Sequence, residues 1–322
     1  MEAAVKKYVI GIDLGGTKIT TAIADLTGEI IEKTTLATGA KEGQDVVMGR
    51  IIESVAMVLE ASGLPKEEVW TIGLGTPGPI DTMTGSIITT ANLPFRNYSV
   101  TRPLEEHFHI PVFLDNDANV AAIGEWMFGA GVGYQNVIYL TVSTGVGGGA
   151  VLNGRPYHGS TSNALEIGHM TIDPFSKHQC NSGHYGDVEA LCSGTAISKR
   201  AKEAITSGRQ TILTEHEVIT AYEVYQAYEA GDALSKEILD EAWDYLGIAI
   251  ANLIVTFDPD IIAIGGGVSR IGKVMFDAVK ASAQKRCIEF MFNSVKIVPT
   301  GLKQDTGVMG AIALALVNSR EK

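Results

Sequence analysis

The stretch YVIGIDLGGTKITTAIADLTGEIIEKTTL, residues 8–36, decides the fold. Runs rich in β-branched residues are interrupted by Gly15-Gly16 and again by Thr27-Gly28, and such pairs mark tight turns. The pattern predicts three strands in a meander. From residue 45 to residue 64 apolar residues recur at helical spacing, and Gly63 with Pro65 ends the run, so a helix is expected to follow the strands.

The same order returns in VIYLTVSTGVGGGAVLNGRPY, residues 137–157, where a glycine-rich turn again separates two β runs. Further strands are expected in residues 70–78, 111–117, 260–267 and 295–299. Further helices are expected in residues 118–131, 189–207, 232–257, 271–289 and 307–317. Helices that alternate with strands indicate an α/β fold. Two tandem modules of meander plus helices predict two similar lobes with a cleft between them, where small-molecule sites usually lie.

The composition excludes several classes of protein. The chain has 322 residues, of which 45% are hydrophobic, and 37 acidic against 25 basic residues give a net charge of −12. Attraction to nucleic acid or to an anionic membrane would therefore have to be local. Three cysteines form a sparse, odd set that favours a reducing compartment. No apolar run approaches the ~20 residues that span a bilayer, and no secretion signal is evident, so we expect a cytoplasmic protein.

The first glycine turn, GIDLGGTK at residues 11–18, nearly matches the phosphate-loop pattern. That pattern requires Gly-Lys-Ser/Thr at the start of a helix, whereas this turn leads into a strand. A glycine hairpin can still direct amide groups at a phosphate, and Asp13 beside it could hold Mg²⁺ directly or through water. An ordinary β-turn is the alternative.

Two other strings resemble the dinucleotide fingerprint but do not predict an NAD site. In GLGTPG, residues 73–78, Pro77 and the following Pro79 remove amide donors and disfavour the required helix. GVGGGA, residues 145–150, leads into a strand. Three glycine turns remain near strand ends, and a nucleotide in the cleft could use the first two for its phosphates and the third near adenosine. They are Gly15-Gly16, Thr144-Gly145 and Gly265-Gly266-Gly267.

Because of these glycine turns and several other motifs, the chain resembles the ROK family of the actin-like ATPase superfamily. The matching pieces run in the family's order: GIDLGGTK, GLGTPGPID, LDNDANVAAIGE, TVSTGVGGGAVLNG, EIGH, GHYGDVEALCSG and AIGGGVS. The resemblance implies a two-lobed actin-like ATPase (ribonuclease H-like) fold. A small lobe would comprise residues 1–117 with 306–322, and a large lobe residues 118–305. It also implies a homodimer through the large lobe, or a higher oligomer.

The resemblance further implies a kinase that phosphorylates a hexose hydroxyl with MgATP. Asp117 matches the catalytic base that accepts the hydroxyl proton, although an aspartate in LDNDAN could simply cap a helix. Asp115 has the weaker claim to this role, because strand alternation directs it away from the neighbouring Asn116. The implied sugar contacts are Gly78, Asn92, Asn116, Asp117, Glu166, His169 and Glu189. The implied nucleotide contacts are Asp13, Gly15, Gly16, Thr17, Lys18, Thr144, Gly145, Gly265, Gly266 and Gly267.

Each of these contacts also has a structural alternative. Asn92 and Gly78 suit ordinary turns, Glu166 and Glu189 could be helix-entry charges, and His169 could be a structural histidine. Many ROK kinases hold a structural zinc with the EIGH histidine and three cysteines. This chain aligns Cys180, Ser182 and Asp187 with those cysteines, so only one thiol remains.

A closed zinc site needs four ligands, of which His169 and Cys180 supply two. Asp187 could add an oxygen, and His178 or His184 could substitute for a missing ligand. We expect no structural zinc, a loop ordered by hydrogen bonds and packing, and His169 free to contact sugar.

Several alternatives for the function remain open. Some ROK proteins are sugar-responsive repressors with a preceding DNA-binding region, but here the first strand begins almost at once, which favours the enzyme. Nothing in the first glycine turn indicates polyphosphate as the donor, so ATP is expected. Glucose is the commonest acceptor for this motif set, whereas N-acetylmannosamine, N-acetylglucosamine, fructose and allose kinases share the same contacts.

Overall fold

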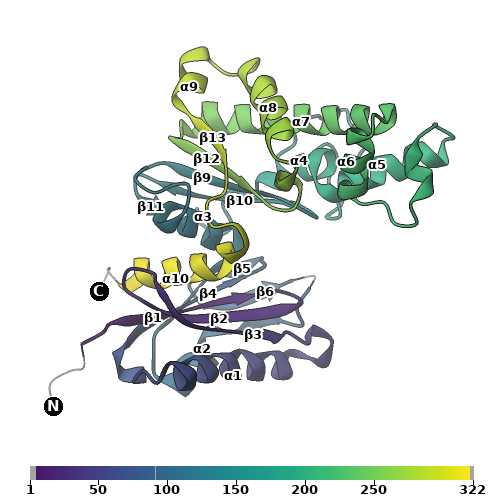
Figure 1. The fold of residues 1–322 in the computed structure, drawn as a ribbon. Coiled ribbons are helices and arrows are strands. Elements are labelled where there is room, and N and C mark those ends of the chain that lie inside the picture. The colour runs from purple at the N-terminus through teal and green to yellow at the C-terminus, as the bar shows by residue number, and fades with distance from the viewer. Residues whose placement is uncertain (1–4, 91, 320–322) are drawn as a thin grey trace.

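In the computed structural model, which describes residues 5–90 and 92–319, two five-stranded sheets lie one above the other (Figure 1). We call the part built on the first sheet the small lobe and the part built on the second the large lobe. The assignment of residues 1–117 with 306–322 to the small lobe and 118–305 to the large lobe stays a prediction. Its residues 1–4, 91 and 320–322 lie outside the described chain.

The small-lobe sheet has the order β3-β2-β1-β4-β8. Its strands are β1 (Tyr8–Leu14), β2 (Lys18–Asp25), β3 (Ile30–Ala37), β4 (Val69–Thr76) and β8 (Val112–Asn116). The first three pair antiparallel, as the meander predicts, and β4 and β8 join in parallel. A three-stranded sheet of β5 (Ile80–Asp81), β6 (Ser86–Thr89) and β7 (Arg96–Ser99), followed by α2 (Thr101–Phe108), completes this side.

Helices cover both faces of the small-lobe sheet (Figure 1). α1 (Gln44–Ser62) packs on β2 and β3, and ends at Gly63, whose φ of 64° gives it a left-handed cap. α10 (Thr306–Ser319) packs on β1 and β4 from the other face. A Cβ at Gly73 would lie 2.1 Å from the Ala311 carbonyl oxygen, so the helix backbone rests directly on the strand. Only glycine permits this approach.

The large-lobe sheet repeats the order as β11-β10-β9-β12-β13. Its strands are β9 (Val137–Val142), β10 (Val146–Leu152), β11 (Arg155–Pro156), β12 (Ile261–Gly265) and β13 (Lys296–Pro299). The first three strands again pair antiparallel and the last two join in parallel. α3 (Asp117–Phe128) packs on β9 and β10 and also on α10, so these two helices form the layer between the sheets.

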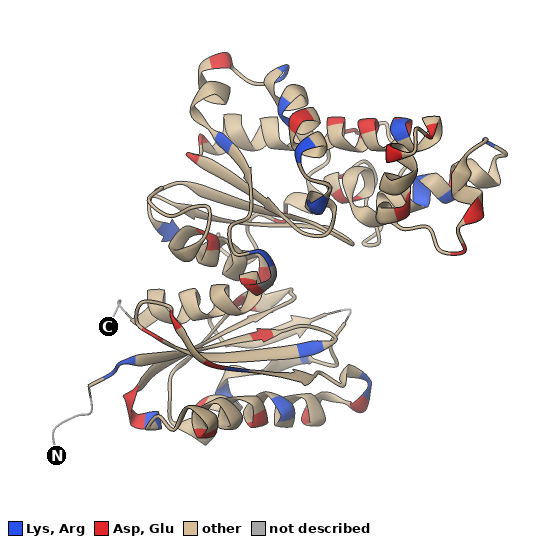
Figure 2. Cartoon of the chain, viewed as in Figure 1, with Lys and Arg blue, Asp and Glu red and all other residues tan. Residues whose placement is uncertain are grey.

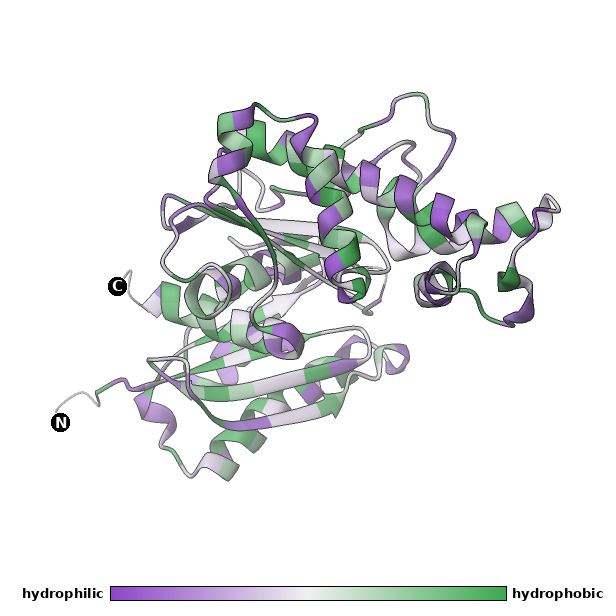
Figure 3. Cartoon of the chain, turned by 45° about the horizontal axis from the view of Figure 1, so that its top comes forward, coloured by the Kyte–Doolittle hydropathy of each residue, from purple (hydrophilic) through white to green (hydrophobic). Residues whose placement is uncertain are grey.

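The other face of the large-lobe sheet carries the remaining helices. They are α4 (Val188–Cys192), α5 (Gly194–Thr206), α6 (Ala221–Glu229), α7 (Ala233–Phe257), α8 (Lys273–Gln284) and α9 (Glu289–Ser294). α7 forms the centre of this core, with Trp243 only 1% exposed. Hydrophobic residues concentrate in the sheets and in the helix faces turned toward them (Figure 3). Acidic and basic residues are interspersed over the outer helices (Figure 2).

Most expected elements are present, with two differences. The single helix expected over residues 189–207 is two helices, because Ser193 ends α4 and its hydroxyl caps α5 by accepting the Ala196 amide at 3.1 Å. The helix expected over residues 271–289 ends at Gln284, and a separate short helix begins at Glu289. Within the described residues, none of the helices combines the length and the apolar character that a bilayer crossing requires.

Candidate active site

A polar cavity of about 340 Å³ lies where β8 meets α3, against the β9–β10 turn. We call it the carboxylate cavity. Its lining includes four of the expected sugar contacts, which are Asn116, Asp117, Glu166 and Glu189. It also includes Thr144 and Gly145 from the expected nucleotide contacts. Side chains from distant parts of the sequence therefore meet at one polar hollow.

The turn from β8 into α3 places Asp117. Asn116 is the N-cap of the helix, with φ −67° and ψ 145°, and its side-chain oxygen accepts the Ala118 amide at 2.9 Å. Asp117 is therefore not the N-cap, although its carboxylate also accepts the Ala118 amide, at 2.8 Å. Asp117 instead occupies the first helical position, where burial raises the pKa of its carboxyl group. A buried carboxylate with a raised pKa is suited to accept a proton.

Asp13 lies near the end of β1, and its carboxylate packs against Gly307 at the start of α10. Burial and the neighbouring Asp117 charge raise the pKa of Asp13 to about 6, while Lys18 acts in the opposite direction. Two carboxylates from different elements thus lie close enough to repel each other. Carboxylate oxygens are the ligands that Mg²⁺ prefers, and a cation would relieve this repulsion, so the donor set fits the expected metal.

Glu166 and Glu189 form the other wall of the carboxylate cavity. Burial raises the pKa of Glu166, as do the charges of Asp117 and Glu189, while His169 lowers it. Glu189 accepts the Val146 amide at 3.1 Å, which holds its side chain against the β9–β10 turn. His169 does not line the cavity, and its Nδ1 lies 3.1 Å from Asp187 Oδ2.

A second, larger cavity of about 740 Å³ lies on the far side of the same turn. Its walls come from the first turns of α5 and α6 and from the segment after β12, with Tyr222, Tyr225 and Val268 among the lining residues. Thr144 and Gly267 are the expected nucleotide contacts that line it. We call it the apolar-walled cavity. Ser143 and Thr144 belong to the lining of both cavities, so the β9–β10 turn separates them.

Some expected contacts lie elsewhere. Gly16, Thr17 and Asn92 line a separate hollow beside the β1–β2 turn. Gly15 closes that turn by donating its amide to the Lys18 carbonyl at 3.0 Å. Gly265 and Gly266 line neither of the two cavities: at Gly266, φ is 88° and a Cβ would lie 2.3 Å from the Val142 carbonyl oxygen. That glycine is required by the close approach of two strands. Gly78 packs against the Asn116 amide group.

Residues 158–163, which were not predicted to be functional, form a strap that joins the lobes beside the carboxylate cavity. Ser162 and Asn163 line the cavity, and the Ser162 hydroxyl lies 2.6 Å from that of Thr82 in the small lobe. Next to them, His158 Nε2 lies 2.6 Å from Asp115 Oδ2, and this hydrogen bond raises the pKa of His158. The polar run STSN, residues 160–163, which lies two residues before EIGH, was the available signal.

Two sheets with the same strand order, one in each lobe, and a cluster of carboxylates where the lobes meet are features of the two-lobed actin-like ATPase fold. The sequence profile of the ROK family matches residues 9–318. The chain belongs to the ROK family.

Known proteins of two kinds are similar to this chain. A glucokinase of Halalkalibacterium halodurans is 36% identical over 98% of both chains. A xylose repressor of Caldicellulosiruptor bescii is 27% identical over 96% of this chain and 78% of its own.

Two solved structures of sugar kinases are also similar to this chain. A ROK hexokinase from Thermus thermophilus is 32% identical, with a TM-score of 0.86 over 98% of this chain and 100% of its own. A ROK family glucokinase from Streptomyces griseus, solved in complex with glucose and AMPPNP, is 29% identical, with a TM-score of 0.76 over 98% of this chain and 100% of its own.

Proposed function

We propose that this protein is an ATP-dependent hexose kinase that transfers the γ-phosphate of ATP to a sugar hydroxyl. One observation carries the proposal: the carboxylate cavity and the apolar-walled cavity share Ser143 and Thr144. A sugar in the first cavity and adenosine in the second would bring the phosphates to this shared turn. Phosphoryl transfer depends chiefly on such in-line positioning and on charge neutralisation.

Asp117 is the proposed general base. It stands in the lining of the carboxylate cavity at the start of α3, and burial raises its pKa toward the range useful for proton transfer. Glu166 and Glu189 would accept hydrogen bonds from sugar hydroxyl groups and hold the reacting hydroxyl near Asp117. Asp13 would hold Mg²⁺, directly or through water, and the ion supplies neutralisation of phosphate charge.

Glucose is the proposed acceptor and glucose 6-phosphate the product. Glucokinases are among the most similar relatives, and the Streptomyces griseus enzyme was solved with glucose. The polar lining of the carboxylate cavity, about 340 Å³ in volume, suits a compact polyol. The other hexoses named above are the competing acceptors.

A coupled assay of ADP release across glucose, mannose, N-acetylmannosamine, N-acetylglucosamine, fructose and allose tests the proposal. We expect Mg²⁺-dependent turnover with the highest kcat/KM for glucose. A higher kcat/KM for an N-acetylated sugar or for fructose would reassign the acceptor. ATP should also be compared with polyphosphate, and higher activity with polyphosphate would overturn the donor assignment.

A sugar-responsive repressor is the second candidate, because xylose repressors are also similar to this chain. The two candidates differ in chemistry rather than in binding. A repressor or sensor would bind sugar in calorimetry yet release no ADP with any sugar, and loss of Asp117 would leave its response intact. Saturable sugar binding without turnover would therefore favour the repressor.

A further inference from the structure

A buried carboxylate precedes the proposed general base in the chain. Asp115 is the next-to-last residue of β8, two residues before Asp117, and its side chain is only 1% exposed. Its Oδ1 accepts the Asn116 backbone amide at 2.7 Å and the Asn119 side-chain amide at 3.0 Å. Its Oδ2 lies 2.6 Å from His158 Nε2. Asp115 thus ties the turn that leads to Asp117 both to α3 and to the strap.

Of these three partners, His158 is the one that can carry a positive charge, because the other two are amides. A buried carboxylate is costly unless it is hydrogen-bonded and its charge is compensated. The hydrogen bond from His158 to Asp115 raises the pKa of His158, so the folded protein favours the imidazolium. The pair therefore combines a hydrogen bond with an ion pair between the lobes.

The other charged groups near this pair have partners of their own. A cavity of about 730 Å³ is lined by both members of the pair and by Arg102 and Glu105 of α2. Arg102 Nε lies 2.7 Å from Glu106 Oε1, and Glu105 accepts the Val112 amide at 3.1 Å. The His158 side chain is 36% exposed, so water reaches the imidazole. Compensation of the buried Asp115 charge is thus left to the strap histidine.

The strap connects this pair to the sugar-binding wall of the carboxylate cavity. The Ala164 amide donates to the His158 carbonyl at 3.1 Å and closes a loop over residues 158–164. Gly159, with φ 69°, supplies the left-handed residue in this loop. Ala164 lines the carboxylate cavity, and Glu166 follows two residues later and lines it as well. His158 is therefore joined on one side to the turn that presents Asp117 and on the other to the segment that presents Glu166.

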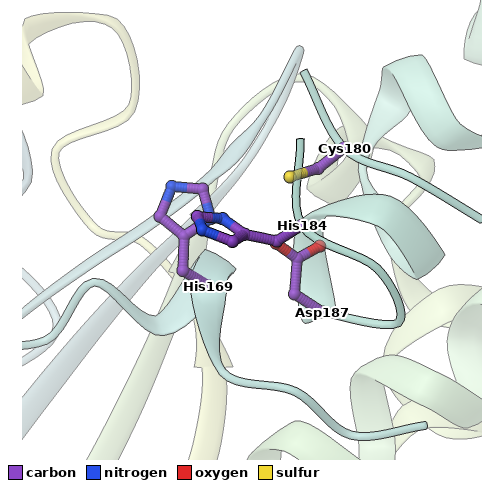
Figure 4. Close-up of side chains that lie close together, drawn as sticks. All are labelled: His169, Cys180, His184 and Asp187. Atoms are coloured by element: carbon purple, nitrogen blue, oxygen red, sulfur yellow. The ribbon is translucent and has the colours of Figure 1, made fainter. Parts of the chain in front are cut away.

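A second histidine–aspartate pair lies farther along the same segment and has different surroundings. His169 Nδ1 faces Oδ2 of the buried Asp187, and this pair belongs to a group of four side chains of metal-binding types (Figure 4). The group, which lies in the segment where the family resemblance implies a metal, consists of His169, Cys180, His184 and Asp187. A cation there could compensate Asp187. Asp115 lies outside this group and depends on His158.

We propose that His158 is a positioning residue for phosphoryl transfer, which holds Asp115 and thereby fixes the turn that presents Asn116 and Asp117 to the sugar. The inference rests on the proposed function. His158 lines neither the carboxylate cavity nor the apolar-walled cavity, so it acts through Asp115 rather than on a substrate. A displacement of about 1 Å at a reacting group can cost up to about 10²-fold in rate, so loss of the pair should lower kcat.

Steady-state kinetics of two His158 variants test the proposal. His158→Ala removes both the hydrogen bond and the charge, and kcat should fall about 10–100-fold, with a smaller change in hexose KM and an unchanged KM for ATP. His158→Gln keeps an amide donor but carries no charge, so it should restore most of the lost kcat.

The pH dependence isolates the charge. His158 becomes neutral as the pH rises through its folded pKa, which lies above the ordinary value of 6.5. The ratio of the wild-type kcat to that of His158→Gln should therefore be largest near pH 6, about fivefold, and should shrink toward pH 9, where neither side chain is charged. Because it is a ratio, the titration of Asp117 and Asp13 affects both enzymes alike.

Thr82→Val is the matched control, because it removes the other bond between the strap and the small lobe and leaves the His158–Asp115 pair in place. It should keep kcat within about threefold of wild type and keep the wild-type pH dependence. Thermal melting shows whether each variant is folded. An equal loss of kcat in Thr82→Val and His158→Ala would overturn the proposal and leave the strap as a structural tie.

Two further outcomes would also overturn it. One is a kcat of His158→Ala within about threefold of wild type. The other, which decides the question if His158→Ala does not fold, is a ratio of wild-type to His158→Gln kcat that does not change with pH. Absence of wild-type turnover with every hexose would refute the proposed function and the role of His158 together, whereas turnover that does not respond to His158 would refute only the latter.

Discussion

The β1–β2 turn and the β9–β10 turn occupy equivalent places in the two sheets, yet they carry different chemistry. Asp13 is the next-to-last residue of β1 and pairs with Gly75, while Thr141 is the next-to-last residue of β9 and pairs with Gly265. The small lobe thus offers a carboxylate where the large lobe offers a hydroxyl. Thr141 lines the carboxylate cavity together with Asp117, and an acidic residue in its place would add to the repulsion between Asp13 and Asp117.

Asp117→Asn tests the proposed general base in the carboxylate cavity. We expect kcat to fall by at least the ~10²-fold typical of losing a general base, with hexose affinity nearly unchanged. Steady-state kinetics and calorimetric sugar binding on the same preparation measure both quantities. Turnover within a few-fold of wild type would remove Asp117 from the role of base.

Asp13→Asn removes the charge that distinguishes the small-lobe turn. If Asp13 binds Mg²⁺ through water, we expect the Mg²⁺ requirement to rise by about 10–100-fold, as for other indirect metal partners. An Mg²⁺ titration at saturating hexose and ATP measures this shift. An unchanged Mg²⁺ dependence would contradict the metal role.

The same variant has a predicted effect on stability without Mg²⁺ or nucleotide. Because the folded-state pKa of Asp13 is raised to about 6 from an ordinary value of 3.8, the ionised carboxylate destabilises the fold. Asp13→Asn should therefore raise Tm above pH 6, and the gain should disappear as the pH falls toward 3.8. A gain that grows on acidification would contradict this assignment.

Gly145→Ala and Gly15→Ala compare the two turns directly. A Cβ at Gly145 would lie 2.3 Å from Glu189 Oε2, whereas a Cβ at Gly15 would lie 3.3 Å from the Lys18 carbonyl oxygen. Glu189 has a flexible side chain and can move away, so Gly145→Ala should keep the fold but raise the hexose KM about tenfold, near the value of one charged hydrogen bond.

Gly15→Ala is the matched variant, and we expect it to change the hexose KM by less than half as much. Thermal melting of both variants checks that the fold is retained. Equal effects of the two substitutions on the hexose KM would mean that the turns do not differ in their relation to the sugar.

The smallest expected effect belongs to the strap between the lobes. Because Asp115 raises the pKa of His158, the folded protein favours the protonated imidazole. The stabilisation is fully present below the ordinary histidine pKa of 6.5 and is lost as the pH rises through the folded value. The Tm difference between wild type and His158→Gln should therefore be largest near pH 6, corresponding to about 1 kcal/mol, and should shrink toward pH 9. A difference that grows with pH would contradict the assignment.

Local sequence signals account for much of the fold. Glycine turns define both meanders, and a strict apolar spacing closed by Gly63 defines α1. Local sequence signals could not predict that Ser193 separates α4 from α5, because the capping role of Ser193 depends on the direction of the Ala196 amide. The candidate site likewise contains residues that the sequence predicted and residues that it did not. The family resemblance of LDNDAN singled out Asp117, which lines the carboxylate cavity. The approach of His184 to His169 depends on a hairpin whose closure no periodicity encodes.

The position of α10 in the chain has a consequence for how the protein folds during synthesis. The strands of the small-lobe sheet are complete at Asn116, but the helix that covers β1 and β4 begins at Thr306. At about 5–20 residues per second, the ribosome needs on the order of ten seconds or more to make the chain between them. One apolar face of the first sheet therefore stays uncovered by α10 until the chain of the second lobe has been made, and exposed apolar surface of this kind favours aggregation.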